Sequence, residues 1–283
     1  MQSYGPNLNE TYKSSTELIK FMDSCTKYVG NLNPIYKFYI WRYTIGSASV
    51  NTFLITGKLS NNAVQWAYLT FLYYSNTFSK IKGLERVGFY DPIIFKSFPK
   101  AKQEYIAKEL ITKYIKIMEK IIKDAPKPTG SFHVFKVASP YPGLPTNVNE
   151  LPASVLQLPF NSTTVTPYFN FAPFLAPTAH CCLFDIEIPK GTSCLFIPQE
   201  YHAYPFEMEI ILPFGCIFNI SKIRTSTLNY VDPTSVNIVQ VQEQGKIRQG
   251  AVYNLNEYAP CKSGRCIIQS KTFTVYDTVL SNK

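Results

Sequence analysis

The chain has 283 residues, of which 46% are hydrophobic and 17% are charged, and its formal net charge is +9. A chain of this length and composition can bury a large core, which excludes an extended disordered protein. The positive charge alone would suit a nucleic acid, an anionic membrane surface or a phosphate-bearing ligand. No arginine-rich run accompanies it, so a nucleic acid is not the expected partner.

The first part of the chain predicts helices. Ser15 is a suitable N-cap for an amphipathic helix that begins at Thr16. Apolar residues recur at helical spacing in Ala48–Leu54 and Asn62–Tyr74, and the clearest helix is Ala101–Lys123. The lysines of this last segment fall between its apolar positions, which indicates the solvated face of a helix rather than a binding stripe.

From Ser131 onward, short β-type runs separated by proline and glycine replace the helical pattern. The predicted strands are Phe132–Ala138, Cys181–Ile188, Ser193–Ile197, Glu207–Leu212, Ile217–Ile223, Val236–Gln242, Ala251–Leu255 and Arg265–Val275. We expect the proline-rich stretch Pro140–Pro177 to be mostly loop. The pattern indicates an α+β fold, with residues 1–125 as a helical lobe and residues 126–283 as a β-rich core. Both lobes are expected to form one domain, with any ligand cleft between them.

The cysteines and the N-terminal segment indicate the cellular compartment in which the protein works. The seven cysteines include no pair of pairs at metal-ligand spacing, so we expect no metal. Cys261 and Cys266 could close a small loop disulfide, but reduced thiols are expected because nothing marks the chain as secreted. Met1–Lys13 lacks the apolar core of a signal peptide, and no apolar stretch reaches membrane-spanning length. These features favour a soluble cytoplasmic protein.

Two glutamates, Glu207 and Glu209, flank Met208 at the start of an apolar run. Residues two apart on a strand point to the same face, so the pair is expected to present two carboxylates side by side. Like charges held close push one pKa up, which suits one group to proton transfer while the other stays ionised. A solvated strand edge is the alternative, because Glu-x-Glu is a common sequence.

Two further motifs carry polar groups that suit a ligand. Ser162, Thr163 and Thr164 place three hydroxyls in a row, which can serve a carboxylate or a ribose, or can simply form a polar turn. Lys136 is a lysine within the strand Phe132–Ala138. It can pair with a phosphate or point outward from a half-buried strand.

Taken in order, these motifs resemble those of the arginine-specific mono-ADP-ribosyltransferases, the family of bacterial exoenzyme toxins and their viral and animal relatives. That family has a strand arginine, then a Ser-Thr-Ser strand, then Glu-x-Glu. This chain has Lys136, then Ser162-Thr163-Thr164, then Glu207-Met208-Glu209. The flanking segments that look similar to the family are Tyr43–Ser47 with Val50–Leu54, Cys182–Thr192 and Glu209–Phe218.

The resemblance implies transfer of ADP-ribose from NAD to an arginine of a protein substrate. Breaking the bond between nicotinamide and ribose leaves an oxocarbenium-like ribose, whose positive charge needs an ionised carboxylate nearby. The resemblance assigns this role to Glu209. It makes Glu207 the general base toward the incoming guanidinium, and it makes Ser162 the residue that orients Glu209.

The same resemblance implies contacts to NAD and to the protein substrate. It places Lys136 and the three hydroxyl residues Ser162, Thr163 and Thr164 in contact with NAD. Phe174 is the phenylalanine expected to cover the nicotinamide, with Phe169 and Phe171 as alternatives. The loop Pro198–Phe206, which carries Tyr201 and Tyr204, is expected to meet the protein substrate.

Two positions depart from the family pattern. Lys136 offers a point charge where the family has a guanidinium fork, whereas Thr164 replaces a serine but keeps its hydroxyl. The lysine leaves a second hypothesis open, a catalytically degenerate protein of this fold that serves as a binding or structural component, for example in a virion. A third hypothesis, a basic nucleic-acid-associated protein, rests on the net charge alone. Residues 224–283 lie beyond the matched motifs and are expected to supply closing strands and a β appendage.

Overall fold

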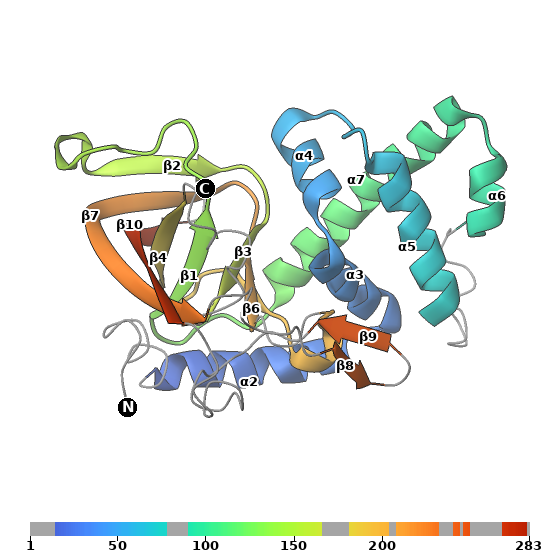
Figure 1. The fold of residues 1–283 in the computed structure, drawn as a ribbon. Coiled ribbons are helices and arrows are strands. Elements are labelled where there is room, and N and C mark those ends of the chain that lie inside the picture. The colour runs from blue at the N-terminus through green and yellow to red at the C-terminus, as the bar shows by residue number, and fades with distance from the viewer. Residues whose placement is uncertain are drawn as a thin grey trace.

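The computed structural model of the protein describes residues 15–77, 90–165, 181–203, 208–231, 240–243, 246–249 and 268–281. Its helices are α2 (Thr16–Asn31), α3 (Pro34–Ile45), α4 (Ala48–Thr56), α5 (Ala63–Thr77), α6 (Pro92–Ser97) and α7 (Lys100–Asp124). Figure 1 shows α3 to α7 gathered on one side of the molecule and the sheet on the other, with α2 running along the foot of the sheet. The order of helices first and strands second confirms the predicted α+β class. No helix in the described ranges is long and apolar enough to cross a bilayer.

The predicted helices are confirmed with small shifts in their bounds, but α3 and α6 were not predicted. Ser15 caps α2 as expected, since its Oγ accepts a hydrogen bond from the Leu18 amide at 3.1 Å. The two unpredicted helices both begin with proline after a capping side chain, Asn33 for α3 and Asp91 for α6. Helix α3 is buried on several sides, so its sequence lacks the two-faced pattern by which the other helices were recognised.

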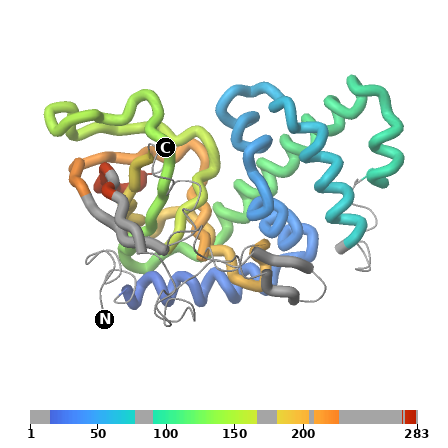
Figure 2. Tube along the Cα trace, in the orientation of Figure 1, coloured from blue at the N-terminus to red at the C-terminus, as the bar shows by residue number. Residues whose placement is uncertain are grey.

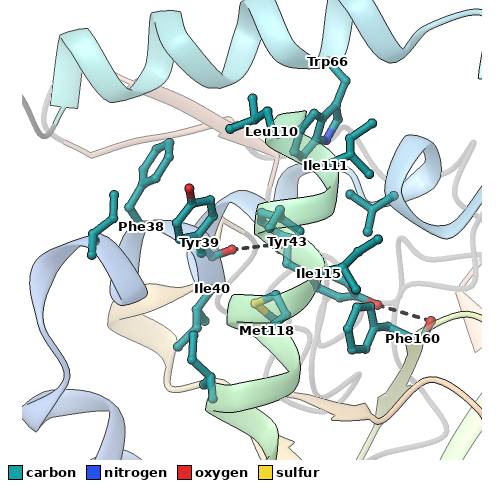
Figure 3. Close-up of a cluster of buried hydrophobic side chains, with 14 of the residues drawn as sticks. Phe38, Tyr39, Ile40, Tyr43, Trp66, Leu110, Ile111, Ile115, Met118 and Phe160 are labelled. Atoms are coloured by element: carbon teal, nitrogen blue, oxygen red, sulfur yellow. Dashed lines mark hydrogen bonds between the residues drawn. The ribbon is translucent and has the colours of Figure 1, made fainter. Parts of the chain in front are cut away.

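Helix α7 is the centre of the helical lobe. Its apolar face carries Leu110, Ile111, Ile115 and Met118, which Figure 3 shows packed among side chains of the neighbouring helices. The Tyr114 hydroxyl donates to the Tyr39 carbonyl at 2.9 Å, which ties α7 to α3. The lysines on the opposite side of α7 are exposed, as the sequence predicted.

A buried arginine joins α3 to α5. Arg42 is 2% exposed, and its Nε donates to Thr70 Oγ1 at 2.9 Å. The guanidinium also lies over the Trp66 ring at 4.8 Å and the Tyr73 ring at 5.8 Å. Burial lowers the pKa of Arg42 to about 10, so the group stays charged at neutral pH. The helical lobe is therefore fixed by a cation that is held by a hydroxyl, carbonyls and aromatic rings.

Eight strands form one mixed sheet in the order β2-β7-β10-β4-β1-β3-β6-β5. Their bounds are β1 (Phe132–Ala138), β2 (Ala153–Gln157), β3 (Asn161–Thr164), β4 (Cys182–Ile188), β5 (Leu195–Phe196), β6 (Glu209–Leu212), β7 (Cys216–Val231) and β10 (Ile268–Ser281). Strand β10 runs parallel to β4, and the other neighbours in the sheet are antiparallel. Figure 2 shows this last strand, drawn in red near its end, lying among earlier ones. Two short strands, β8 (Gln240–Glu243) and β9 (Lys246–Gln249), pair separately.

Several strand predictions need correction. Strand β6 begins at Glu209 rather than Glu207, because Met208 has a φ of 42°, which an extended strand does not allow. Strands β7 and β10 continue to Val231 and Ser281, well beyond the predicted ends at Ile223 and Val275. Most of the described part of Pro140–Pro177 lies outside strands, as expected, but β2 and β3 within it were not predicted. The prolines of this part fall before β2 or between β2 and β3, so each strand is free to pair.

Some predictions fall outside the described residues. These are the strand Ala251–Leu255, most of the strand Val236–Gln242, and the candidate disulfide between Cys261 and Cys266.

An ionic cluster spans four strands of the sheet. Asp185 on β4 and Asp277 on β10 are register partners, so two like charges stand opposite each other. Arg224 on β7 bridges them, with Nη2 at 2.7 Å from Asp185 Oδ2 and Nε at 2.6 Å from Asp277 Oδ1. His133 on β1 adds a contact of 2.7 Å between its Nδ1 and Asp185 Oδ1. The cluster thereby links β1, β4, β10 and β7 side by side.

The free energy of unfolding should decrease as pH rises through the titration of His133. The hydrogen bond with Asp185 raises the pKa of His133, against the opposing effect of burial. A raised pKa stabilises the fold below the unfolded value of about 6.5, and this stabilisation is lost as pH rises through the folded pKa. Urea unfolding of wild type and His133→Gln from about pH 5.5 to about pH 8 measures the effect. Parallel pH profiles for the two proteins would contradict it.

Candidate active site

Glu209 stands at the start of β6 and is the one carboxylate residue that is buried in the part of the chain described, with 3% exposed. Its Oε2 lies 2.8 Å from Nε2 of His202, which is 2% exposed. Its backbone carbonyl accepts from the Ile197 amide at 2.9 Å. A carboxylate removed from water needs such partners, because an uncompensated buried charge is strongly unfavourable.

Strand β3 brings hydroxyl groups beside this carboxylate. Thr164 is the register partner of Glu209, and Ser162 is the partner of Ile211. Because side chains alternate along a strand, Ser162, Thr164 and Glu209 lie on one face, with Ser162 diagonal to Glu209. Ile211 on that face belongs to the core of the helical lobe, so the face is turned toward the helices. Thr163 points the other way and donates to the Ile210 carbonyl at 2.7 Å.

Tyr43 reaches the same region from α3. Its hydroxyl donates to the Phe160 carbonyl at 3.4 Å, the bond drawn as a dashed line in Figure 3. Burial raises the pKa of Tyr43, and the negative charge of Glu209 raises it further. Hydrogen bonding with the Ser162 side chain acts in the opposite direction. Tyr43 is therefore close to both Ser162 and Glu209, and it stays neutral over the physiological range.

Asn51 on α4 carries an unsatisfied acceptor. Its Nδ2 lies 3.4 Å from both Ser47 Oγ and the Phe160 carbonyl, so it borders the Tyr43 hydroxyl. Its Oδ1 is buried and has no hydrogen-bond partner among the residues described. Buried polar atoms are nearly always paired, and an orphan at a site calls for an explanation. A hydroxyl or amide N–H of a ligand would satisfy it.

Lys136 on β1 is half-buried and approaches β3. Its Nζ lies 3.5 Å from the Ser162 carbonyl, which is a weak contact. Burial lowers the pKa of Lys136, while the charge of Glu209 acts in the opposite direction. The register pairs Phe135 with Thr164, so alternation places Lys136 on the face opposite to Glu209. Lys136 thus reaches the backbone at Ser162 from behind the strand.

The segment between β5 and β6 is fastened to α3. It includes the short helix η2 (Gln199–Tyr201), and the Tyr201 ring lies 5.2 Å from the Lys37 amine. Farther along the segment, the Ala203 amide donates to Thr44 Oγ1 at 2.9 Å. The described part of the predicted substrate loop therefore rests on the helical lobe.

Several predicted site residues lie outside the described part of the chain. They are Glu207, Tyr204, Phe169, Phe171 and Phe174. Their roles remain predictions.

No protein-family model and no curated protein matches this sequence. Solved structures do match. The ADP-ribosylating toxin BECa of a binary enterotoxin of C. perfringens aligns over 94% of this chain and 48% of its own, with 14% identity and a TM-score of 0.51. The enzymatic component C2-I of the C2-toxin from Clostridium botulinum aligns over 94% of this chain and 47% of its own, with 13% identity and a TM-score of 0.50.

This chain has the ADP-ribosyltransferase fold. It spans about half the length of the BECa and C2-I chains. It also aligns with Plx2a, an ADP-ribosyltransferase toxin from Paenibacillus larvae, over 94% of this chain and 95% of that one, with 13% identity and a TM-score of 0.48. The fold that the order of the sequence motifs predicted is confirmed.

Sequence reasoning assigned no role to three residues that the structure brings to Glu209 or its neighbours. Tyr43 and Asn51 fall within segments that looked similar to the family, but a pattern of segments does not say which side chain points where. His202 precedes Glu209 by seven residues in a loop, where neither strand nor helix periodicity places a side chain. Only the folded chain shows that its imidazole meets the carboxylate.

The Thr44→Val substitution should loosen the loop that carries His202. It keeps the side-chain shape but removes the acceptor for the Ala203 amide, and a net hydrogen bond contributes about 1 kcal/mol. Hydrogen exchange at Ala203 should become about fivefold faster, whereas Thr44→Ser should exchange like wild type. Equal protection of Ala203 in Thr44→Val and wild type would show that this bond does not hold the loop.

Proposed function

We propose that this protein transfers ADP-ribose from NAD to an arginine side chain of a protein. The observation that carries the proposal is the position of Glu209. This carboxylate stands on the sheet face that also presents Ser162, beneath Tyr43, in a chain with the ADP-ribosyltransferase fold. The resemblance in the Glu-x-Glu motif supports arginine as the acceptor.

The reaction breaks the bond between the nicotinamide nitrogen and the ribose carbon, and the bonding electrons leave with nicotinamide. Glu209 as a carboxylate stabilises the positive charge that develops on the ribose. A guanidinium nitrogen of the acceptor arginine then bonds to that carbon and gives up a proton. In the proposal Glu207 takes this proton.

The groups around Glu209 fit a ligand that carries ribose hydroxyls and an amide. Ser162 is exposed beside the carboxylate, and the unsatisfied Asn51 Oδ1 offers an acceptor. Phe174 is the proposed cover for the nicotinamide, and Thr163 and Thr164 complete the proposed hydroxyl-bearing strand. BECa, which shares the fold, has a crystal structure with NADH.

The compartment proposed for this activity is the cytoplasm. Cys25, Cys182, Cys194 and Cys216 are buried free thiols. Burial raises the pKa of each of them, so they stay protonated and unreactive. Free thiols in a stable core are typical of a protein that works in a reducing environment.

Substitution of each glutamate should separate the two proposed roles. Glu209→Gln keeps the shape but removes the charge, so it should lower both transfer and NAD hydrolysis by about 100-fold or more. Glu207→Gln should lower arginine transfer by a similar factor and largely spare hydrolysis, because water needs less help from a base than a guanidinium does. Nicotinamide release with and without an arginine acceptor measures both steps. Equal losses of both activities in the two variants would contradict the division of roles.

We propose that Lys136 contacts a phosphate of NAD. Substitutions that change the reach and the charge of this side chain test the contact. The Lys136→Arg side chain reaches farther than lysine and offers two parallel N–H groups to a phosphate bound near Ser162. NAD should bind several-fold more tightly to Lys136→Arg, and more weakly to Lys136→Met, in calorimetric titration. If all three proteins bind NAD equally, Lys136 only supports the backbone of β3.

The second hypothesis, a catalytically degenerate protein of this fold, is supported by the same geometry. Lys136 replaces a guanidinium, and Glu209 is 3% exposed with one oxygen already engaged. A binding or structural protein of this fold would hold NAD without releasing nicotinamide, or would not hold NAD at all. Incubation with labelled NAD and a protein lysate, followed by mass spectrometry for modified arginines, decides between the two functions.

A further inference from the structure

His202 and Glu209 form a pair that is shielded from water. Nε2 and Oε2 are 2.8 Å apart, and the two side chains are 1% and 4% exposed. The proposed reaction needs Glu209 as a carboxylate, which can only accept hydrogen bonds, so the proposal places the proton of this contact on Nε2 of His202. One of the two carboxylate oxygens of Glu209 is therefore committed to the imidazole, and Oε1 is the oxygen left for a substrate.

The helical lobe sets where this imidazole stands. The His202 amide donates to the Gln199 carbonyl at 3.3 Å, which closes η2 just before the ring. The next residue, Ala203, is bonded to Thr44 Oγ1, and Thr44 in turn donates to the Trp41 carbonyl at 2.7 Å. These bonds hold the backbone on both sides of His202 and so fix the point from which its ring reaches Glu209.

We propose that His202 is a positioning residue for Glu209, which holds Oε2 so that Oε1 meets the ribose of NAD. This inference rests on the proposed ADP-ribosyl transfer. It goes further, because it assigns a second residue to control the orientation of the carboxylate. Neither the Glu-x-Glu motif nor the hydroxyl strand supplies that control.

The contact bears on the chemical step. A donor that holds Oε2 leaves Oε1 aimed at the ribose, where positive charge develops as the bond to nicotinamide breaks. Loss of this donor should therefore lower the rate of bond breaking more than the affinity for NAD.

Two substitutions separate positioning from simple packing. His202→Leu removes the donor, so kcat for nicotinamide release should fall by about 10- to 100-fold while KM for NAD stays within about threefold of wild type. His202→Gln keeps an N–H donor near the position of Nε2. It should retain kcat within about threefold of wild type. The matched control is Glu109→Gln, an exposed position on α7, which should leave kcat unchanged.

Several outcomes would overturn the inference. They are a wild-type kcat in His202→Leu, or a rise in KM with kcat unchanged. Failure of His202→Gln to rescue a slow His202→Leu would reduce His202 to a packing role.

A measurement that needs no activity tests the pair itself. The ¹⁵N shifts of the histidine rings should place the proton of His202 on Nε2, and these shifts should change in Glu209→Gln. Unchanged shifts in that variant would overturn the pairing, whatever the enzyme does. If the pairing is seen but the wild type releases no nicotinamide, the proposed function has failed, and the catalytic role of His202 is rejected with it.

Discussion

A carboxylate held out of water between a sheet and a helical lobe is the constraint on which the site depends. Glu209 can be buried because β3 and β5 pair on either side of β6, the Ile197 amide binds its carbonyl, and an imidazole meets its side chain. These partners come from two segments of the chain, β3 and the stretch from Leu195 to His202. A charge in such surroundings is costly unless all of them are in place, so the local fold and the state of the carboxylate are linked.

The helical lobe takes part in the site because the two lobes share one core. Phe160, Leu195 and Ile211 from the sheet belong to the same buried cluster as the apolar face of α7. That packing sets α3 and α4 over β3, where Tyr43 and Asn51 border Ser162. A displacement of α3 would therefore move both the Tyr43 ring, which lies close to Glu209, and the loop that carries His202.

The sequence predicted what local patterns encode, and it missed what depends on contacts between distant segments. The periodicity of α7 and the cap at Ser15 identified two helices, and strand β1 has the predicted bounds. Helix α3 was missed because burial on several sides removes the polar stripe that marks a helix. Strand β2 was missed because prolines on both sides masked a short pairing segment. In the site, the motif order pointed to Ser162 and Glu209, whereas the contact with His202 depends on how a loop crosses α3.

The proposed roles of Lys136 in NAD binding and of Glu209 in the chemical step depend on different contacts. Its amine sits behind β3, near the Ser162 carbonyl, and burial already weakens its hold on a proton. A single ammonium in this place grips a phosphate less firmly than a guanidinium fork would. The carboxylate on the other face of the strand keeps its own set of partners and does not depend on Lys136 for its position. A chain of this design should therefore lose affinity for a dinucleotide before it loses the ability to stabilise charge at the ribose.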